Sequence, residues 1–265
     1  MKRSTLIILA LLALAIAVAF IPMGDGDSRV TPIPAGDSLL IVSVPDGDGG
    51  RLIEYEGFTV YFRPDMHQPG YVAWTLSPDE AEADVANRRD ATFRTDTEVA
   101  GCATLEDYRN SGFDRGHMAP AADMKWSHKA MADCHLLTNI CPQDKSVNGG
   151  PWATIEKNSR KWSQRFGELY IVAGPVLGDR LTRSIGPSKV PVPERFFKVI
   201  VAPEAQPPMG IAFLMPNHPF DGGAQSTVMS IDEIEAITGY DFFPALPDDV
   251  ENVVEAQHSM AAWNH

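Results

Sequence analysis

The run SGFDRGHMAP, residues 111–120, holds Asp114, Arg115 and His117 within four positions. Two glycines flank these side chains, and glycine lets the backbone approach a bound ligand closely. An apolar run, HLLTNICPQ at residues 135–143, follows and predicts a strand. The sequence therefore predicts one strand that ends on a histidine and a second strand after it.

A helix is predicted next, in the run ATIEKNSRKWSQRF at residues 153–166. Pro151 suits the first turn of a helix. Ile155, Trp162 and Phe166 then recur at spacings of seven and four, which places them on one apolar side. The predicted order is therefore strand, strand and helix.

Polar residues stand at the entrance and on one side of this helix. Asn148 lies just ahead of it, and Glu156 and Arg160 are four positions apart, so both point to one side. Taken singly, such residues are most often a cap, a surface ion pair or, for His117, a buried structural histidine. Their joint order, however, allows His117, Asn148 and Glu156 to surround one metal ion.

This set of side chains suits the hydrolysis of a phosphodiester. That reaction needs a base to activate water, positive charge on the phosphate and stabilisation of the leaving 3′-oxygen. A neutral histidine serves as a base near neutral pH. A hydrated Mg²⁺ needs few direct protein ligands and accepts an amide oxygen, while arginines bind the non-bridging oxygens.

The rest of the chain predicts more strands than helices, with no fixed-period repeat and no glycine-rich phosphate loop. A mixed α+β fold class follows. Strands are predicted at residues 38–44, 52–55, 58–62, 71–76, 169–173, 196–201 and 211–215, and helices at residues 78–88 and 230–239. The second of these helices begins with a capping box, Ser230 with Glu233, and ends at Gly239.

Charge excludes a polybasic nucleic-acid binder, because the 265 residues carry 22 Lys and Arg against 35 Asp and Glu, a net charge of -13. The distribution is uneven. Residues 85–165 carry 12 basic and 10 acidic groups, whereas both flanking parts of the chain are strongly acidic. Any attraction for a polyanion must therefore come from the middle third.

The amino terminus predicts delivery out of the cytoplasm. Lys2 and Arg3 precede an uninterrupted apolar run from Leu6 to Ile21. We expect an export signal or a membrane anchor at 1–24, an acidic Gly/Pro-rich linker at 25–50, the folded domain at 51–247 and a tail at 248–265. The expected location is the periplasm, the extracellular space or, through the anchor, the membrane surface.

The three cysteines permit at most one internal disulfide and do not indicate the compartment. An alternative hypothesis takes Cys134, Cys141, His117 and His135 as a structural zinc site. Alternation argues against it, because Cys134 and His135 would face opposite sides of a regular strand. The cysteines are then expected to be small buried apolar residues.

The run YRNSGFDRGHMAPAADMKWSHKAM at residues 108–131, followed by LTNICPQ and NGGPWATIEKNSR, closely resembles the DNA/RNA non-specific endonuclease family and its endonuclease G-like branch. The resemblance extends over about 200 residues, from near residue 50 to residue 247. It implies a ββα-metal (His-Me finger) nuclease fold, with a central antiparallel sheet and flanking helices.

The resemblance also implies roles for individual residues. His117 matches the general base, Asn148 the direct metal ligand, and Glu156 the residue that holds the metal's waters. Arg89 and Arg115 match phosphate-facing arginines; Arg88 adjoins Arg89, and only one of them can fill that position. Asn139 and Arg160 match residues that orient the base or the phosphate, and Asp114 is expected to brace the backbone.

We therefore expect an Mg²⁺-dependent, sugar-non-specific endonuclease, with Mn²⁺ as a substitute metal and with DNA and RNA as substrates. The alternative is a catalytically silent nucleic-acid-binding protein of the same fold. Because His117 and Asn148 are both present, the enzyme is favoured. A homodimer is implied by the family, and association with a membrane by the amino-terminal run.

Overall fold

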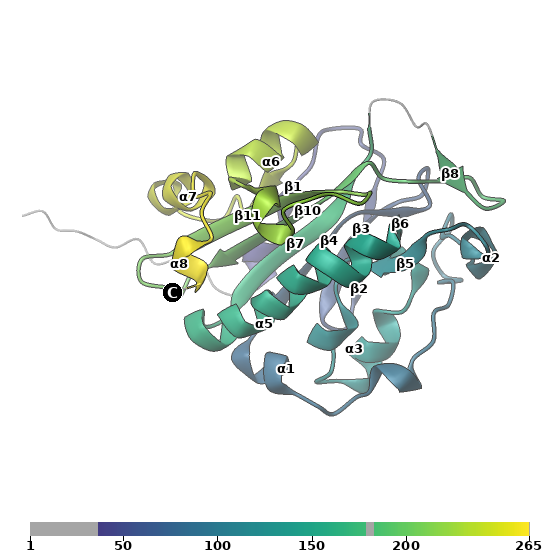
Figure 1. Cartoon of the computed structure of the whole chain (residues 1–265), viewed down its shortest axis with the longest axis horizontal. Helices are drawn as coiled ribbons and strands as arrows, with labels where there is room; N and C mark the ends of the chain where they lie inside the picture. Colours follow the sequence, from purple (N-terminus) through teal and green to yellow (C-terminus); the bar gives the residue numbers. More distant parts are fainter. Residues whose placement is uncertain (1–36, 179–182, 265) are drawn as a thin grey trace, which may run out of the picture. The chain divides into compact units, whose positions relative to one another are not determined.

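Seven antiparallel strands form the central sheet of the computed structural model, in the order β12-β11-β10-β7-β4-β3-β2 (Figure 1). The structure describes residues 37–178 and 183–264. The strands of this sheet are β2 (Arg51–Tyr55), β3 (Phe58–Arg63), β4 (Gln68–Leu76), β7 (Leu169–Val176), β10 (Arg195–Ala202), β11 (Met209–Pro216) and β12 (Val228–Met229). The strands predicted between residues 52 and 76 and between residues 169 and 215 are confirmed, as is the α+β class.

Alternation along the strands supplies an apolar surface to each face of this sheet. In β10, Phe196 and Ile200 belong to one buried cluster, whereas Phe197, Val199 and Val201 belong to another. Side chains on a strand point alternately to opposite faces, so these two clusters lie on opposite sides of the sheet. Both faces must therefore be covered.

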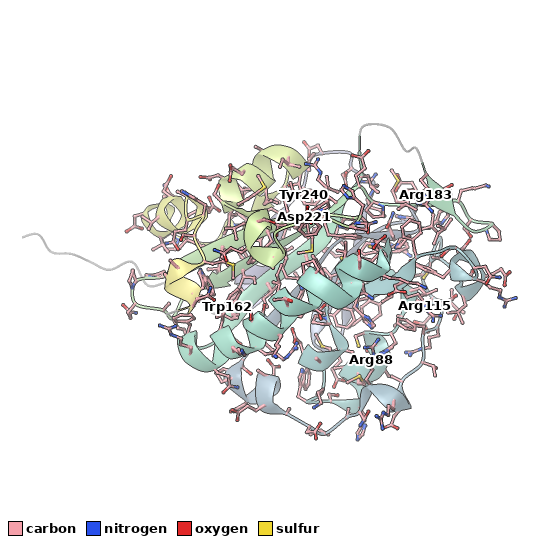
Figure 2. The ribbon with its side chains drawn as sticks, in the orientation of Figure 1. Arg88, Arg115, Trp162, Arg183, Asp221 and Tyr240 are labelled. Carbon is pink, nitrogen blue, oxygen red and sulfur yellow. The ribbon has the colours of Figure 1, made fainter. Side chains whose placement is uncertain are left out.

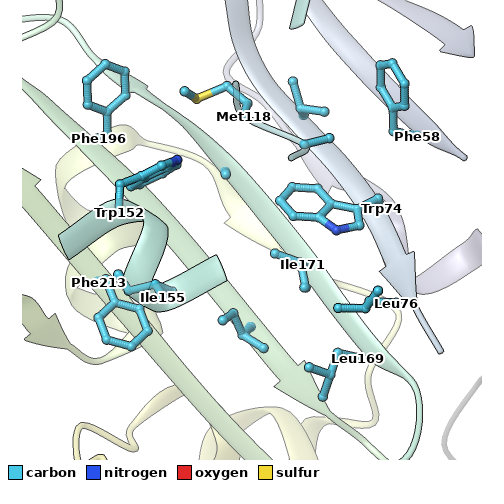
Figure 3. Packing of buried hydrophobic residues seen from close by; sticks show 14 of the residues in the cluster. Phe58, Trp74, Leu76, Met118, Trp152, Ile155, Leu169, Ile171, Phe196 and Phe213 are labelled. Carbon is cyan, nitrogen blue, oxygen red and sulfur yellow. The ribbon is translucent and has the colours of Figure 1, made fainter. Parts of the chain in front are cut away.

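Helix α5 (Ala153–Phe166) covers the first face. Its buried residues Ile155 and Trp162 belong to the same cluster as Trp74, Phe196 and other residues from the sheet. Figure 3 shows Ile155 and Trp152 of this region beside the aromatic side chains of the strands. The predicted helix is confirmed, and its apolar side is the side that packs.

Helices α6 (Ile231–Thr238) and α7 (Asp248–Glu255) cover the second face (Figure 1). The predicted capping box of α6 is present, since the Ser230 side chain accepts from Glu233 N at 3.1 Å and Glu233 accepts from Ser230 N at 2.8 Å. Gly239 ends the helix in the left-handed conformation, at φ +71°.

A separate two-stranded ribbon carries the DRGH sequence. Strand β5 (Asp114–His117) pairs antiparallel with β6 (Ile140–Gln143), and His117 is opposite Ile140. The strand predicted at residues 135–143 is too long: Leu137–Asn139 forms a 3₁₀ turn, η4, and α3 (His128–Asp133) ends at Cys134. Apolar composition alone does not separate a short turn from a strand, which explains the difference.

Short elements connect these parts. They are η1 (Asp37–Leu40), β1 (Val42–Ser43), α1 (Pro78–Glu82), η2 (Arg88–Asp90), α2 (Leu105–Tyr108), η3 (Ala121–Asp123), α4 (Lys145–Val147), η5 (Asn148–Trp152), β8 (Ser184–Ile185), β9 (Val190–Pro191), η6 (Ala224–Thr227), β13 (Asp241–Phe242) and α8 (Ala261–Asn264). The helix predicted at residues 78–88 is thus shorter than expected.

The expected chain boundaries need correction at both ends. Residues 248–264 are not a tail: α7 and α8 bury Val254 and Trp263, and the Trp263 ring lies 4.8 Å from that of Trp162. Part of the expected linker also folds onto the domain, since β1 pairs with β13 and buries Val42. The apolar side chains of these segments find partners that local composition does not reveal.

The predicted signal or anchor at residues 1–24 lies outside the described residues. None of the helices within residues 37–178 and 183–264 has the length and hydrophobicity that a membrane span requires.

Carboxylates crowd the junction of α6 and α7. One oxygen from each of Asp232, Glu235 and Glu255 lies within 4.8 Å of the others. Glu255 is only 7% exposed, and its Oε1 has no hydrogen-bond partner among the described residues. Burial and the neighbouring carboxylates, Glu235 first, raise the pKa of Glu255 from 4.5 to about 8, and burial raises the pKa of Glu235 to about 6.

We expect Glu255→Gln to stabilise the protein at alkaline pH. The folded state holds the Glu255 proton more tightly than the unfolded chain, so the free energy of unfolding falls as pH rises from 4.5 to about 8. The substitution should raise that free energy by about 1 kcal/mol near roughly pH 9, and by less near roughly pH 6. Urea denaturation at both pH values measures the difference.

The matched control is Glu82→Gln, which removes an exposed carboxylate of α1 that makes no side-chain hydrogen bond or ion pair with the described residues. Its effect should be within about 0.5 kcal/mol at either pH. Equal stability of the Glu255→Gln variant and the wild type at both pH values would contradict the electrostatic account.

Candidate active site

A cleft of 590 Å³ opens where the β5–β6 ribbon meets the start of α5. Its lining comprises Asp84, Asn87, Arg88, Arg89, His117, Pro120, Ala121, Ala122, Lys125, Met131, Asn148, Gly149, Ala153 and Glu156. The structure thus brings together four of the predicted site residues: Arg89, His117, Asn148 and Glu156. The other three, Arg115, Asn139 and Arg160, do not line this cleft.

A larger cavity of 780 Å³ lies beside β2, and its lining includes Arg51, Tyr55, Arg94 and Asp96. Its lining has no histidine and no cysteine. Tyr55 and Asp96 there already bond to each other at 2.6 Å. The smaller cleft is therefore the better candidate for catalysis.

His117 is held at the end of β5 with its ring free. It is 8% exposed, and its Nε2 has no hydrogen-bond partner among the described residues. Burial, followed by the nearby His135, Arg88 and Arg115, lowers the pKa of His117 well below its usual value of 6.5. A buried ring that is neutral at physiological pH and has an uncommitted nitrogen can accept a proton.

The backbone around His117 is fixed on both sides. Trp152 Nε1 donates to the His117 carbonyl at 3.2 Å, which ties the end of β5 to the turn that precedes α5. Gly116 is opposite Cys141, and a Cβ at this glycine would lie 2.2 Å from Gln143 Oε1. The glycine of the DRGH sequence is therefore required by close packing of the two strands.

Asn148 presents an amide oxygen to the cleft region. Its Nδ2 donates to Asp114 Oδ2 at 3.0 Å, and a carboxylate oxygen only accepts, so the orientation of the amide is determined. The Oδ1 atom is left for a ligand. This brace gives Asp114 the structural role that the sequence implied.

A turn between Asn148 and α5 sets the spacing of the site. Gly150 has backbone angles of φ −111° and ψ −111°, which are not helical, and Pro151 and Trp152 then lead into α5. The predicted entrance to the helix is thus a π-helical turn, η5, rather than a regular first turn. Glu156 follows one turn inside α5.

Glu156 is half-buried and lies near two charged side chains, Lys198 and Asp123, that the sequence analysis did not identify. Burial raises its pKa to about 7, while the charge of Lys198 opposes that rise. Lys198 is 1% exposed, and its Nζ lies 4.3 Å from the centre of the Trp152 ring and 5.3 Å from that of Trp74. A lysine within the otherwise apolar run FFKVIVA, residues 196–202, could have been noticed as unusual.

Arg160 pairs with Asp123 rather than with Glu156. Its Nη1 donates to Asp123 Oδ1 at 2.7 Å, and Trp74 Nε1 donates to Asp123 Oδ2 at 3.2 Å. Asp123 is 2% exposed, so burial raises its pKa although Arg160 opposes the rise. Arg160 also lowers the pKa of Glu156, so its charge lies near the carboxylate that lines the cleft.

Asn139 is a buried brace. Its Nδ2 donates to the carbonyls of Ala119 and Cys134, both at 2.9 Å, and its Oδ1 accepts from Ala119 N at 2.9 Å. These bonds hold the segment that follows His117 against the end of α3. Asn139 therefore bonds to the backbone near His117, and its role in orienting the base stays a prediction.

The arginines differ in how closely they approach His117. Arg88 lowers the pKa of His117, His135 and Glu156, so its charge lies near all three. The Arg115 guanidinium lies 4.5 Å from the centre of the Phe93 ring and also lowers the pKa of His117. Arg88 and Arg115 are labelled among the side chains in Figure 2. Both Arg88 and Arg89 are exposed on η2.

Comparison with known proteins identifies the family of this chain. The family described as DNA/RNA non-specific endonuclease matches residues 35–249. Endonuclease G, mitochondrial, from Homo sapiens is 33% identical over 208 residues, which cover 73% of this chain and 70% of the human protein. Nuclease EXOG, mitochondrial, from Danio rerio is 37% identical over 208 residues, which cover 72% of this chain and 60% of the zebrafish protein.

A solved structure agrees at the level of the fold. A chain in the crystal structure of the EndoG/EndoGI complex, which concerns the mechanism of EndoG inhibition, superimposes with a TM-score of 0.69 at 24% identity. The match covers 74% of this chain and 86% of that chain. The predicted family and the ββα-metal nuclease fold are confirmed.

The comparisons contradict the expected location. Similar proteins from Homo sapiens, Danio rerio, Schizosaccharomyces pombe and Saccharomyces cerevisiae are all named as mitochondrial nucleases. Export to the periplasm or the extracellular space and membrane anchoring are therefore wrong as predictions. They depended on the apolar run Leu6–Ile21 alone, which lies outside the described residues.

Asn139→Ala should lower the free energy of unfolding by about 2–4 kcal/mol. The change leaves one buried N–H and two buried carbonyls without their partner, and each unsatisfied group costs about 1–3 kcal/mol before local relaxation. Urea denaturation followed by circular dichroism measures this loss.

Asn252→Ala is the control, because Asn252 is exposed and its amide bonds only to the Asp248 carbonyl of its own helix. It should cost less than about 0.5 kcal/mol. Similar losses in the two variants would show that Asn139 is not a brace of the active-site backbone.

Proposed function

Because the chain belongs to the DNA/RNA non-specific endonuclease family, we propose that it is a metal-dependent endonuclease that hydrolyses phosphodiester bonds in DNA and RNA. The observation that carries this proposal is that His117, whose ring has a nitrogen without a hydrogen-bond partner among the described residues, lines the same cleft as Asn148 and Glu156. A base and a set of oxygen ligands on one cleft are what hydrolysis of a phosphodiester requires.

His117 acts as the general base in this proposal. The ring is neutral because burial and nearby positive charges disfavour its protonated form. It takes a proton from the attacking water, and the resulting oxygen nucleophile forms the new bond to phosphorus as the 3′-oxygen leaves. Because the end of β5 is fixed, the ring is already oriented for this proton transfer.

Asn148 and Glu156 are the residues that would hold a divalent cation. Asn148 Oδ1 is left uncommitted by the bond from Nδ2 to Asp114, and Glu156 lines the same cleft with a carboxylate. Both offer oxygen, the donor that Mg²⁺ and Mn²⁺ prefer, so the residues fit the expected cofactor. When bound, such a cation supplies positive charge for the leaving oxygen.

We assign the phosphate-facing position of the first arginine to Arg88 rather than to Arg89. Both line the cleft, but the charge of Arg88 is among the main causes of the pKa shifts of His117 and Glu156, and Arg89 is not. Arg115 lies close enough to His117 to contribute a second positive charge. Contacts of this kind go to the phosphate and carry no base recognition, which suits cleavage of both DNA and RNA.

Plasmid and total-RNA digestion by the full chain tests the proposal. Wild-type protein with Mg²⁺ or Mn²⁺ should degrade both polymers, and EDTA should abolish the activity. His117→Ala should reduce the rate by about 10²–10⁴-fold, because a general base contributes about that factor. The variant must show the wild-type circular dichroism spectrum for the comparison to count.

His128→Ala is the matched control, because His128 is an exposed histidine at the start of α3 that does not line the cleft. It should retain wild-type activity. A wild-type protein that binds both polymers but leaves them intact with Mg²⁺, Mn²⁺ and other divalent metals would refute the enzyme. The catalytically silent binding protein would then be the correct interpretation.

Arg88→Ala should lower kcat/KM for plasmid cleavage by about 10–100-fold, and Arg89→Ala by less than about threefold. The larger loss corresponds to a charge-assisted contact of about 1.5–3 kcal/mol to the reacting phosphate. A greater loss for Arg89→Ala than for Arg88→Ala would reverse the assignment.

A further inference from the structure

We propose that His117, Cys134 and His135 form a binding site for a thiophilic transition metal such as Zn²⁺, and that a metal bound there inactivates the nuclease by occupying its general base. The metal site itself stands on the geometry of these three residues. The inhibition rests on the proposed function, because it requires His117 to be the base.

The three side chains converge in the interior next to the cleft. One ligand atom from each lies within 4.8 Å of the others, and the residues are 8%, 0% and 2% exposed, respectively. The rings of His117 and His135 meet edge to face with their centres 4.9 Å apart. Imidazole nitrogen and thiolate sulfur are both common ligands of zinc.

The alternation argument against such a site does not hold in the folded protein. Cys134 is the C-cap of α3, with helical backbone angles of φ −63° and ψ −15°, and β6 begins only at Ile140. Consecutive residues face opposite sides only within a strand. Cys134 and His135 lie in a turn instead, and their side chains converge. Cys141, the remaining cysteine of the earlier hypothesis, is in β6 and outside the cluster.

Two features beyond the clustering point to a ligand. The Nε2 of His117 is buried without a hydrogen-bond partner in the described part of the chain, which is costly unless something binds it. His135 Nδ1 lies 2.8 Å from the Met131 carbonyl, which can only accept, so Nδ1 carries the proton and Nε2 keeps its lone pair. A backbone carbonyl that fixes the tautomer of a histidine in this way is typical of metal-binding histidines.

The donors select the metal. Thiolate and imidazole favour Zn²⁺, Co²⁺ and Cu⁺ over Mg²⁺, which prefers the oxygens of Asn148 and Glu156. Tetrahedral zinc requires neighbouring ligand atoms about 3.3–3.8 Å apart, so the side chains must close by up to about 1 Å.

Binding exchanges one proton for one metal bond at Cys134. Burial raises the pKa of this thiol to about 12, and its Sγ–H donates to the Met131 carbonyl at 3.2 Å. The metal displaces that proton, which passes to solvent as the metal–sulfur bond forms. Arg88 and Arg94 lie close enough to affect the cysteine and His135, and their charge limits the affinity for a cation.

Coordination removes the lone pair that catalysis needs. A neutral imidazole has one nitrogen with a lone pair and one with a proton. When a metal takes the lone pair of His117, the other nitrogen carries the proton and cannot accept another from water. A thiophilic metal and Mg²⁺ would therefore act on adjacent sites with opposite effects.

Cobalt titration of the full chain tests the site without any measurement of activity. Metal-free protein should bind one equivalent of Co²⁺ with a thiolate-to-cobalt charge-transfer band in the near ultraviolet. Cys134→Ser should lose the band, and His135→Phe should weaken Co²⁺ binding by at least about 10-fold. Cys141→Ser, which changes an equally buried cysteine outside the cluster, should keep the band.

Zinc inhibition of Mg²⁺-dependent plasmid cleavage tests the consequence. Cys134→Ser and His135→Phe should retain cleavage without zinc and should need at least about 10-fold more Zn²⁺ for half-inhibition than the wild type or Cys141→Ser. His135→Phe keeps an aromatic ring at the place where His135 now packs 5.0 Å from Phe93, so this variant should fold even where Cys134→Ser does not.

The outcomes separate this proposal from the proposed function. The absence of a charge-transfer band in wild-type protein, or equal zinc inhibition of the wild type and both variants, would overturn the site and assign inhibition to the Asn148 and Glu156 ligands. An inactive wild-type protein that still shows the cobalt band would instead refute the nuclease and retain the metal site.

Discussion

Packing of α5 against the sheet removes four charged side chains from bulk water, and their mutual neutralisation is the constraint on which the active site depends. Glu156 and Arg160 come from α5, Lys198 from β10 and Asp123 from η3. Two acids face two bases, with Trp74 and Trp152 filling the space around Lys198. Removal of one member would leave an uncompensated buried charge, which costs more than the pair contributes. The position of α5, and with it the place of Glu156 relative to His117, is therefore tied to a balanced set of charges.

The same burial that fixes His117 determines its chemistry. Desolvation keeps the ring neutral, and within residues 37–178 and 183–264 its Nε2 has no hydrogen-bond partner. An unsatisfied buried nitrogen lowers the stability of the fold, and this cost is accepted where the nitrogen must remain available to react. Asn139 offsets part of this loss of stability, because it holds the adjacent backbone through three hydrogen bonds. The uncommitted Nε2 of His117 has a further chemical consequence, because a nitrogen that is free to accept a proton is equally free to bind a metal.

Local signals in the sequence predicted local structure well, and contacts between distant segments less well. The capping box at Ser230, the terminal glycine of α6 and the order of strand, strand and helix around His117 each depend on neighbouring residues, so they could be predicted. Trp263 could not, since an acidic segment with one tryptophan resembles a tail until Trp162 and Phe166 provide a surface for it. Within the site, the resemblance identified four of the residues that line the cleft, namely Arg89, His117, Asn148 and Glu156. It did not indicate Asp123 or Lys198, whose roles arise only when η3, β10 and α5 come together.

The arrangement in layers also explains how an acidic protein can present a site for a polyanion. The crowded carboxylates of α6 and α7 lie on one face of the sheet, and α5 with its cleft lies on the other. Each layer is roughly 10 Å thick, so the two sets of charges are about 20 Å apart, more than twice the Debye length of about 8 Å at physiological ionic strength. Salt therefore screens the acidic helices from the cleft, while Arg88 and Arg115 lie close enough to His117 to lower its pKa. Attraction for nucleic acid is thus confined to the few phosphates that enter the cleft, and long-range steering of the polymer contributes little.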